Sequence, residues 1–537
     1  MQDSATLMAP TAHQLYRARR CITCSTTWLV LILLSASASD WPQYRGANHD
    51  GISTDRITRN WTGSVTNPVW LVPSSDAFNS ICSFAVSGGS AFTQAHRIID
   101  GADKEVCVAL NITNGAELWA SVPLDDAIYS GGVGYDDGPR STPTVDNGSV
   151  YVLTSYLKLY RLNATDGSVI WHKDLQAIYG GSVIGWQNAA SPLLENGLIF
   201  VNVSSDQQSL VALQTSDGEP AWQSQNEEYM THSTPVLATI HGVRQVIFAT
   251  QNGLVALSPL NGNLLWRFPY PFFYSTSLGA SPVVYDDMVF ITGAHAYGMG
   301  SVVAQINLTN NILVPKQLWF TNNPAAHWMT PVAFQGFLYG EFGIQQFDGT
   351  PRTQLKCIEM RTGAVKWSVD NFGHGGLVLA DNNLVVVTEP GELVLVQPNT
   401  NSYVELGRFL AIPNYNGDTN KCWNSPAVAD GRVYVRSTAF GACFDLSMPP
   451  LLKLDPPSRT PPNKFQLTIR TIDGTPIDSN RLAAMELHAS TNLAQSLSSW
   501  PKLTNNLLLS NGVANVTNID GSFSRDRFFI ISEPNQP

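Results

Sequence analysis

Several acidic and basic side chains flank runs of β-branched residues in this 537-residue chain, and they define the chemistry open to it. The acids are Asp136, Asp137, Glu341 and Glu389, and the cations are Arg140, Lys421 and Arg436. A carboxylate can serve as a general base, carboxylates with an amide can bind Ca²⁺, and cations can hold an anionic cofactor. The fold must bring these distant positions together before any such chemistry can occur.

Motifs for other common chemistries are absent from the sequence. No Gly-rich phosphate loop opens a helix, no Gly-x-Ser-x-Gly is present, and no CxxCH provides for covalent haem. His295, His327 and His374 lack the short spacing of metal ligands, so satisfied loop histidines are the better interpretation. Charged residues make up only 14% of the chain and form no basic stripe, which argues against a nucleic-acid partner.

Tryptophan recurs with a period of about 40 to 50 residues, the spacing expected of repeat architectures. The repeated positions are Trp70, Trp119, Trp171, Trp222, Trp266, Trp319 and Trp367, followed by Tyr403. Most of them close one eleven-residue frame, as in Ala109-Leu-Asn111 through Gly115 to Trp119. This frame predicts a strand, a tight turn whose Gly takes positive φ, and an outer strand whose indole packs between neighbouring units.

A second element opens the units: Ser/Thr-Pro, then a turn and a β-branched run, as in Ser425-Pro426 ahead of Val433-Tyr-Val435. Proline cannot donate to a sheet ladder and suits the first residue of a strand. Each unit is therefore expected to hold four strands, and the units lie near 82–121, 141–173, 190–224, 232–268, 279–320, 329–369, 375–407 and 424–446. The eighth unit lacks a Trp strand, whereas Trp70 forms a strand without a unit. Joining the two predicts an all-β, eight-bladed β-propeller closed by an N-terminal strand.

The Ala-x-Asp/Asn-x₃-Gly-x₃-Trp frame resembles the tryptophan-docking repeat of the quinoprotein-type, or PQQ-like, β-propellers over roughly residues 40–446. The stretches Asp40-Trp-Pro-Gln-Tyr-Arg-Gly-Ala-Asn-His-Asp-Gly51, Gly138-Pro-Arg-Ser-Thr-Pro143 and Cys422-Trp-Asn-Ser-Pro426 are similar to those of secreted PQQ-binding-like repeat proteins. That family contains quinone-dependent dehydrogenases and also non-catalytic members, including the outer-membrane β-barrel assembly lipoprotein. The resemblance therefore implies a fold and leaves the activity open.

In a propeller, the loops before the first strand and after the second strand of each blade ring one mouth of the central channel. For a dehydrogenase of this family, the resemblance implies a carboxylate base, Ca²⁺ ligands and cations for the PQQ carboxylates. The candidates are Asp137 and Glu341 as catalytic residues, Arg140, Lys421, Trp423 and Arg436 for the cofactor, and Glu389 and Asn424 for the metal. The same loops also hold Gln187, His232, His295, Tyr297, His327, Trp328 and His374.

Two functions remain open at this mouth. The sequence has neither an adjacent Cys pair nor a haem-attachment motif, which speaks against alcohol oxidation. We therefore favour a scaffold that binds a small molecule or a protein at the channel mouth. The alternative is a PQQ- and Ca²⁺-dependent dehydrogenase acting on alcohols or sugars.

Residues 1–39 have the features of an export signal. Arg17, Arg19 and Arg20 precede an apolar core from Thr27 to Leu34 and a stretch of small residues. The core is shorter than the roughly 20 residues that span a bilayer, so no membrane span is expected in the mature chain. Loss of three Arg and one Asp changes the net charge from −11 to −11 − 2 = −13. We expect a periplasmic or secreted protein.

The remainder of the chain is expected to form a proline-rich linker over residues 448–462 and a C-terminal β-rich module over residues 463–537. Alternating apolar and polar residues in the module favour a small β-sandwich. Five cysteines follow the export signal, at 82, 107, 357, 422 and 443. Cys357 is expected in the core, and disulfides among the other four, within a unit or across the ring closure, are compatible with export.

Overall fold

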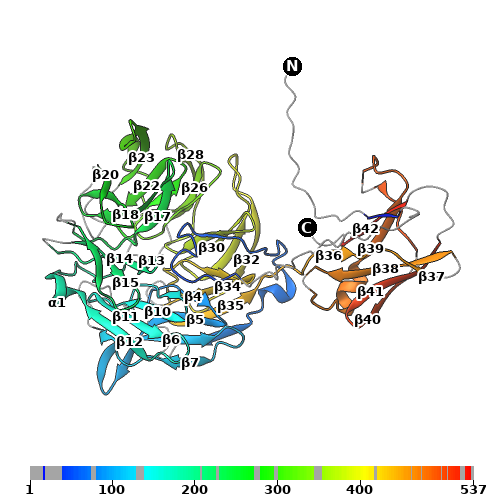
Figure 1. The fold of residues 1–537 in the computed structure, drawn as a ribbon, viewed down its shortest axis with the longest axis horizontal. Helices are drawn as coiled ribbons and strands as arrows, with labels where there is room; N and C mark the ends of the chain where they lie inside the picture. Colours follow the sequence, from blue (N-terminus) through cyan, green and yellow to red (C-terminus); the bar gives the residue numbers. More distant parts are fainter. Residues whose placement is uncertain are drawn as a thin grey trace. The chain divides into compact units, whose positions relative to one another are not determined.

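The computed structural model describes residues 16–18, 39–73, 80–127, 138–205, 209–224, 229–270, 278–294, 300–343, 353–416, 420–460, 463–472, 474–496, 499–504, 506–520 and 527–533. The chain divides into two compact units (Figure 1). The larger unit is Ala38–Ser447, and the smaller unit comprises Met1–Ser37 and Met448–Pro537.

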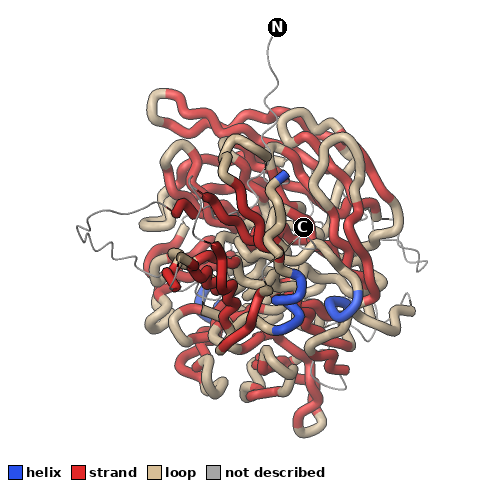
Figure 2. Tube along the Cα trace, turned by 90° about the vertical axis from the view of Figure 1, so that its right-hand side faces the viewer, coloured by secondary structure: helices blue, strands red, loops and turns tan. Residues whose placement is uncertain are grey.

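In the described residues, the larger unit contains eight sheets, each built on four antiparallel strands, which we number 1 to 8 in chain order. Strands dominate this unit and helices are few (Figure 2). Sheets 1 to 4 are β4 (Ala85–Ser87), β5 (Ser90–Ile99), β6 (Ala102–Asn111), β7 (Glu117–Ala120); β9 (Thr144–Asp146), β10 (Ser149–Leu153), β11 (Lys158–Asn163), β12 (Val169–Asp174); β13 (Leu193–Glu195), β14 (Leu198–Asn202), β15 (Leu210–Gln214), β16 (Pro220–Gln223); and β17 (Val236–Ile240), β18 (Val243–Thr250), β19 (Gly253–Leu257), β20 (Leu264–Pro269).

Sheets 5 to 8 repeat this order and add strands from elsewhere in the chain. They are β21 (Val283–Tyr285), β22 (Met288–Gly293), β23 (Gly300–Thr309), β24 (Ile312–Thr321); β25 (Val332–Phe334), β26 (Phe337–Phe342), β27 (Gln354–Glu359), β28 (Val365–Val369); β29 (Gly376–Ala380), β30 (Asn383–Val387), β31 (Glu392–Val396), β32 (Glu405–Leu410); and β33 (Ala427–Ala429), β34 (Arg432–Arg436), β35 (Phe440–Asp445), β3 (Trp70–Pro73). Additional elements are β8 (Asp125–Asp126) on sheet 1, β2 (Ile52–Ser53) on sheet 7, η1 (Gly63–Thr66) and α1 (Leu175–Tyr179).

Five repeated tryptophans pack against a glycine of the next sheet, as the frame predicts: Trp70, Trp119, Trp171, Trp222 and Trp319. Gly167 has φ +72°, and a Cβ placed there would lie 2.4 Å from the Trp119 ring. The Trp119 indole Nε1 donates to the Ala164 carbonyl at 3.1 Å. The same donation to a carbonyl of the following sheet recurs at Trp70, Trp171, Trp222, Trp319 and Trp367. We call these five residues and Trp119 the docking tryptophans.

Trp266 differs from the docking tryptophans. Its indole donates to Gln245 Oε1 in its own sheet at 2.6 Å, although the ring is buried in a core shared by sheets 4 and 5. Sheet 5 replaces the Gly-containing turn with a long hairpin of β23 and β24, ten residues each. The hairpin takes the place of the short turn whose carbonyl accepts from the docking tryptophans at the other junctions.

The prediction that the Trp70 strand completes the last sheet is confirmed. β3 pairs antiparallel with β35, with Trp70 opposite Cys443. Sheets 8 and 1 also meet through the hydroxyl of Ser83, which donates to the Ser425 carbonyl at 2.5 Å. A single buried core cluster contains Phe84 of the first repeat and Val433 of the eighth.

The cysteines of the larger unit do not form the disulfides that export made plausible. All five thiols in the described residues are free and buried. Cys82 Sγ lies 3.4 Å from Nη1 of Arg436, so it is engaged in a polar cluster between sheets 8 and 1. Cys357 lies in the core, as predicted.

The smaller unit has two sheets around one apolar core. One sheet has the order β1 (Tyr16–Ala18), β42 (Arg527–Ser532), β39 (Glu486–Ser490). The other has the order β36 (Leu452–Leu454), β38 (Lys464–Thr471), β41 (Val513–Asp520), β40 (Leu507–Ser510), with β37 (Ser458–Thr460) also on β38. Both sheets contribute to the core, for example through Ile469 and Phe529. The one helix of this unit in the described residues is α2 (Ser479–Ala484).

Two segments of this unit bear on the predicted domain boundaries. β36 and β37 lie inside 448–462, the predicted linker, and both pair with β38. The alternation in Leu452-Lys-Leu454 gives β36 the pattern of a strand despite the surrounding prolines. The predicted export signal lies outside the described residues except for Tyr16–Ala18 and Ser39, and it stays a prediction.

Candidate functional site

Equivalent positions of sheets 6, 7 and 8 supply most of the predicted site. Glu341 lies near the end of β26, and Glu389 follows β30. Trp328, His374 and Trp423 precede the first strands β25, β29 and β33. Because first strands begin and second strands end at the same edge of each sheet, these side chains gather at one end of the repeat. We call this group, with Lys421 and Asn424, the mouth cluster.

Glu341 is the most unusual member of the mouth cluster. Its side chain is 1% exposed, and neither carboxylate oxygen has a hydrogen-bond partner among the described residues. Burial, and then the nearby charge of Glu389, raise the pKa of Glu341 well above its usual range. Both effects disfavour the charged form, so this carboxyl group tends to keep its proton.

Glu389 lies in a different environment although it is also buried. Its Oε2 accepts the His374 backbone N–H at 3.1 Å and lies 3.3 Å from His374 Nδ1. Burial raises the pKa of Glu389, but the hydrogen bonds and charge of His374 outweigh it and bring that pKa below its usual value. The cluster thus pairs a carboxyl that favours its neutral form with one that favours its charged form, an arrangement suited to acid–base or ligand recognition.

Aromatic rings pack together next to His374, the partner of Glu389. The Trp328 ring centroid lies 4.8 Å from that of Trp423 and 5.1 Å from that of His374. Lys421 Nζ lies 4.5 Å from the Trp423 ring centroid, a cation–π contact.

Unpartnered polar groups occur together in this cluster. The indole Nε1 of Trp423 and the amide Nδ2 of Asn424 have no hydrogen-bond partner in the described part of the chain. The Trp423 indole is near enough to Glu389 to help lower the pKa of that carboxyl, but it lies outside hydrogen-bond geometry. Together with Glu341, the mouth cluster therefore offers both donors and acceptors.

The remaining predicted residues lie elsewhere or are engaged by the protein itself. Arg436 is fully buried and donates to the Ser80 and Gln94 carbonyls at 3.2 and 3.3 Å and to the Thr93 hydroxyl. Arg140 donates to the Trp186 carbonyl at 2.8 Å. Asp136, Asp137, His295 and Tyr297 lie outside the described residues, so their predicted roles stay predictions.

An N-terminal segment, residues 40–53, crosses the opposite end of the sheets and was not predicted as a structural element. Trp41 forms a bridge with Val86 of sheet 1, and the Pro42 carbonyl accepts Val145 N–H of sheet 2 at 2.7 Å. Arg45 is buried and donates to the Thr330 and Pro331 carbonyls of the sixth repeat at 3.0 and 2.9 Å. A periodicity search could not find this segment, because its sequence occurs once.

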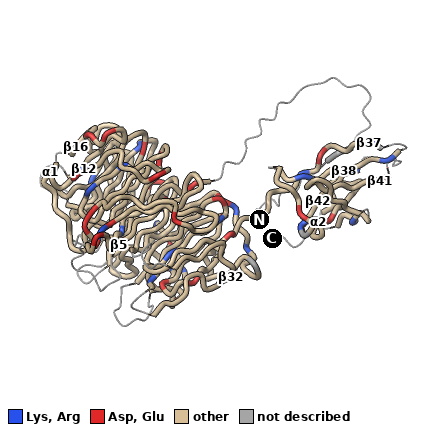
Figure 3. Tube along the Cα trace, turned by 90° about the horizontal axis from the view of Figure 1, so that it is seen from below, with Lys and Arg blue, Asp and Glu red and all other residues tan. Residues whose placement is uncertain are grey.

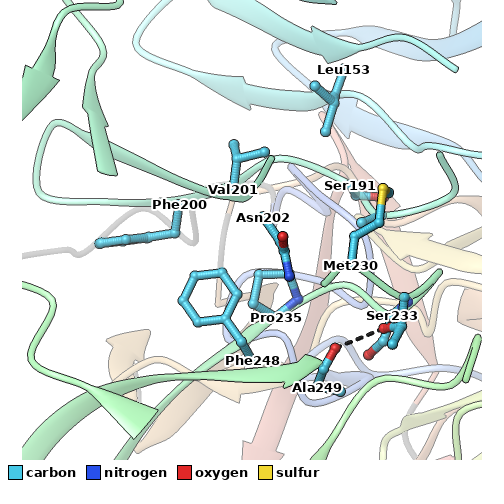
Figure 4. Close-up of a pocket in the computed structure, with 12 residues that line it drawn as sticks. Leu153, Ser191, Phe200, Val201, Asn202, Met230, Ser233, Pro235, Phe248 and Ala249 are labelled. Carbon is cyan, nitrogen blue, oxygen red and sulfur yellow. Dashed lines mark hydrogen bonds between the residues drawn. The ribbon is translucent and has the colours of Figure 1, made fainter. Parts of the chain in front are cut away.

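The described residues of this unit enclose a small and a large cavity. The smaller, shown in Figure 4, lies between sheets 3 and 4 near Phe200, Met230 and Phe248 and has a volume of about 10 Å³, space for about one water molecule. The larger has a volume of about 860 Å³ and is lined by the N-terminal segment and by the ends of β13, β17, β21 and β25. Its size falls in the range of about 300–1,000 Å³ typical of ligand pockets.

The charged side chains and possible metal ligands of the larger unit bear on which ligands it could bind. Acidic and basic residues are interspersed along it, without a basic stripe (Figure 3). In the described residues, no three His, Cys, Asp or Glu side chains come together as a metal site. No helix in the described segments has the length and apolar character needed to cross a membrane.

Comparison with known proteins identifies sequences that are similar to this chain. Residues 102–350 match the family model described as outer membrane protein assembly factor BamB. The chain is 23% identical to the outer membrane protein assembly factor BamB of Yersinia pestis over 238 residues, which is 42% of this chain and 55% of that protein. It is 28% identical to the protein of that name in Moranella endobia over 171 residues, or 30% of this chain and 38% of that protein.

A solved structure extends the likeness over more of the chain. Quinohemoprotein alcohol dehydrogenase from Comamonas testosteroni superposes with a TM-score of 0.50 at 13% identity, covering 78% of this chain and 82% of that one. At this identity the likeness concerns the fold alone. The chain spans about half or less of the length of the curated relatives that it matches.

Proposed function

Since the chain belongs to the PQQ-like repeat family, we propose that it is an exported β-propeller scaffold that binds a partner at the mouth cluster. The eight sheets close into one ring in this proposal. Its support is the pairing of β3 with β35 and the contact between Ser83 and Ser425, which join the last sheet to the first.

One observation carries the binding function: in the described residues, the buried carboxyl of Glu341 and the N–H groups of Trp423 and Asn424, all in the mouth cluster, have no hydrogen-bond partner. A buried polar group without a hydrogen bond costs about 1–3 kcal/mol, and native proteins keep few of them. A bound partner with hydroxyl or amide groups would donate to Glu341 and accept from the two N–H groups. The half-exposed rings of Trp328 and Trp423 would give that partner an apolar surface.

A PQQ- and Ca²⁺-dependent dehydrogenase is the second candidate, because a quinohemoprotein structure shares the fold. The described residues fit that anionic cofactor poorly. Arg436 uses its donors on protein carbonyls, Arg140 donates to Trp186, and Lys421 lies over Trp423. The charged carboxylate of Glu389 faces the same region, and it would repel the carboxylates of PQQ. Glu341, Glu389 and Asn424 supply oxygen ligands of the kind that Ca²⁺ prefers, although Glu389 is already paired with His374.

Export and the identity of the partner also belong to this proposal. Export is supported by the basic, apolar and small-residue order of residues 1–39 and by relatives whose names refer to outer-membrane protein assembly. Those names suggest a protein partner at the mouth. The aromatic and polar cluster would equally accept a small molecule.

Native mass spectrometry of the full-length protein tests the binding function. We expect a ligand mass on the wild type that is at least about tenfold less abundant on Glu341→Gln, because Gln replaces a carboxyl oxygen, which can accept from the ligand, by an NH2 group that can only donate. Glu359→Gln, on the same sheet but outside the mouth cluster, is the matched control and should retain the ligand. For a protein partner, benzoylphenylalanine at position 423 should cross-link it, whereas the same group at Trp171 should not.

Two outcomes would contradict the proposal. The binding function would be excluded if the wild type, Glu341→Gln and Glu359→Gln all showed only the mass of the protein itself and position 423 gave no specific cross-link. Retention of PQQ after gel filtration with Ca²⁺, with dye reduction by alcohols or sugars, would instead establish the dehydrogenase.

A further inference from the structure

The larger cavity lies at the end of the sheets away from the mouth cluster. β25 shows this directly, because Trp328 precedes it at the mouth, whereas Phe334 and Gln335 at its other end line the cavity. The cavity is therefore a second, separate site, and it does not depend on the binding function proposed for the mouth.

Runs of consecutive residues make up much of the lining of this cavity. They include the consecutive residues 236–239 of sheet 4 and 282–286 of sheet 5. Side chains alternate between the two faces of a strand, so an unbroken run of residues can line one cavity only along the edge of the strand. The cavity is thus bordered by the N–H and C=O groups of β17 and β21.

Those edges have no strand beside them in the described residues. β17 and β21 are each the terminal strand of their sheets. β29 occupies the equivalent position in sheet 7, but β2 pairs with it in parallel, with Ile52 opposite Leu379. Leu379 N–H also donates to the Gly51 carbonyl at 2.8 Å. The same end of the unit therefore already holds one extended segment on an inner strand, and that segment comes from this chain.

The charged groups at the cavity do not form a site for a phosphate or another anion. Arg45 donates to the carbonyls of Thr330, Pro331 and Asp50. Arg244 pairs with Glu195, whose carboxylate lies 2.9 Å from Arg244 Nε. With both cations engaged, the backbone edges of β17 and β21 offer hydrogen-bonding groups to a ligand, beside polar side chains such as Asn48, Asp286 and Gln335. Strand addition is the established way in which such edges bind a polypeptide.

We propose that this cavity binds an extended peptide segment of another protein, which adds to the edge of β17 as β2 adds to β29. Main-chain hydrogen bonds supply the affinity, and half-buried Leu194, Tyr285 and Phe334 contact alternate side chains of the peptide. Peptides with apolar residues at every second position are therefore the ligands of this site.

A random dodecapeptide phage library, selected on the immobilised full-length protein, provides the probe. Ala47 is exposed and lines the cavity, so Ala47→Trp fills the cavity without changing the sheets. Ala116→Trp, at an exposed turn of sheet 1, is the matched control. Fluorescence anisotropy of a labelled selected peptide should show binding at least about tenfold weaker to Ala47→Trp and unchanged to Ala116→Trp. Circular dichroism and urea midpoints establish that both variants are folded.

Backbone chemistry of the peptide tests the mode of binding. N-methylation at every second residue removes main-chain donors while keeping the side chains, so it should weaken binding at least about tenfold in one of the two registers. The proposal fails if no peptide is enriched over selection on Ala47→Trp. It also fails if the selected peptide binds both Trp variants equally, or if N-methylation in either register has no effect.

Discussion

The docking tryptophans and Trp423 of the mouth cluster show two uses of one residue type in the same unit. Each docking indole donates to a carbonyl of the next sheet and packs against it, as Trp119 does with Ala164. Trp423 has an Nε1 without a partner in the described residues, and it lies beside Lys421, Trp328 and the buried acids. The docking indoles, whose N–H groups are hydrogen-bonded, stabilise the repeat. The Trp423 N–H, by contrast, lies where a bound partner can accept its hydrogen bond.

The difference teaches that the contacts repeated between sheets and the residues suited to binding lie at different places on each sheet. The turn between the third and fourth strands repeats the same Gly and Trp contact in sheets 1, 2, 3, 4 and 6. The edge where the first strand begins varies from sheet to sheet, and the unpartnered Glu341 and Trp423 lie there. Substitutions at the Gly and Trp contacts should therefore mainly lower stability, whereas substitutions in the mouth cluster should mainly weaken binding.

Truncation of a tryptophan should give the largest contrast between the two regions. Trp119→Ala removes a buried ring from the contact between sheets 1 and 2 and should lower the free energy of unfolding by about 3–5 kcal/mol. Trp423→Ala removes a half-exposed ring and should lower it by about 1 kcal/mol or less. Urea denaturation followed by fluorescence measures both. Equal losses would contradict the distinction.

A methyl group at a docking glycine should have the next largest effect. Gly167→Ala places Cβ within 2.4 Å of the Trp119 ring, and both Gly167 and Gly148 have φ +72°. Gly148→Ala carries the same backbone strain but meets no atom within 4 Å. We expect Gly167→Ala to lose about 1–3 kcal/mol more unfolding free energy than Gly148→Ala. Chemical denaturation of the pair isolates the ring contact, and identical midpoints would exclude it.

The pH dependence of stability should distinguish the two mouth acids. The pKa of Glu341 is raised on folding, so its contribution is fully present below the unfolded value and is lost as pH rises towards the folded value. Glu341→Gln should therefore unfold with about 1–3 kcal/mol less difference between pH 5 and pH 8 than the wild type. The pKa of Glu389 is lowered, so its contribution is present above the unfolded value and is lost as pH falls. A variant Glu389→Gln should thus lose stability at pH 5 and pH 8 alike, with a smaller loss only as the pH falls below the usual pKa of 4.5. A loss that disappears between pH 8 and pH 5 would refute the assignment.

Loss of one indole N–H should give the smallest contrast. Trp119→Phe removes the donation to Ala164 and should lower the unfolding free energy by about 1 kcal/mol beyond the change in ring size. Trp423→Phe removes an N–H that has no partner in the described residues and should change the unfolding free energy by less than about 0.5 kcal/mol. Thermal unfolding of both variants provides the comparison, and a larger shift for Trp423→Phe would reverse it.

The repeat could be predicted from sequence because its contacts are local and recur. The Gly-to-Trp frame and Ser/Thr-Pro openings located the strands, and the missing Trp of the eighth unit identified β3 as its completion. The hydrogen bond of Trp266 to Gln245 was not foreseen, because it depends on the long β23–β24 hairpin of sheet 5. Strands β36 and β37 were assigned to a linker, because prolines around Leu452–Leu454 obscured their alternation.

The candidate site could be predicted only as a set of residues at one end of the sheets. Glu341, Glu389 and Trp423 do meet there. Sequence could not show that His374 pairs with Glu389 while Glu341 stays unpaired in the described residues, because this depends on how side chains of sheets 6 and 7 are oriented in the folded protein. Arg436 appeared to be a cofactor ligand by residue type, but its hydrogen bonds join sheets 8 and 1. The segment around Arg45 crosses the other end without any periodic signal.

The pairing of β3 with β35 determines when, during synthesis, the larger unit can finish folding. Trp70 and Cys443 lie 443 − 70 = 373 residues apart, so the last sheet cannot be completed until nearly all of the larger unit has left the ribosome. Contacts so distant in sequence form late and slowly. Until then β3 has no strand to pair with, and its free backbone groups could pair with another chain. A product truncated before residue 440 would lack β35, so its β3 would stay unpaired.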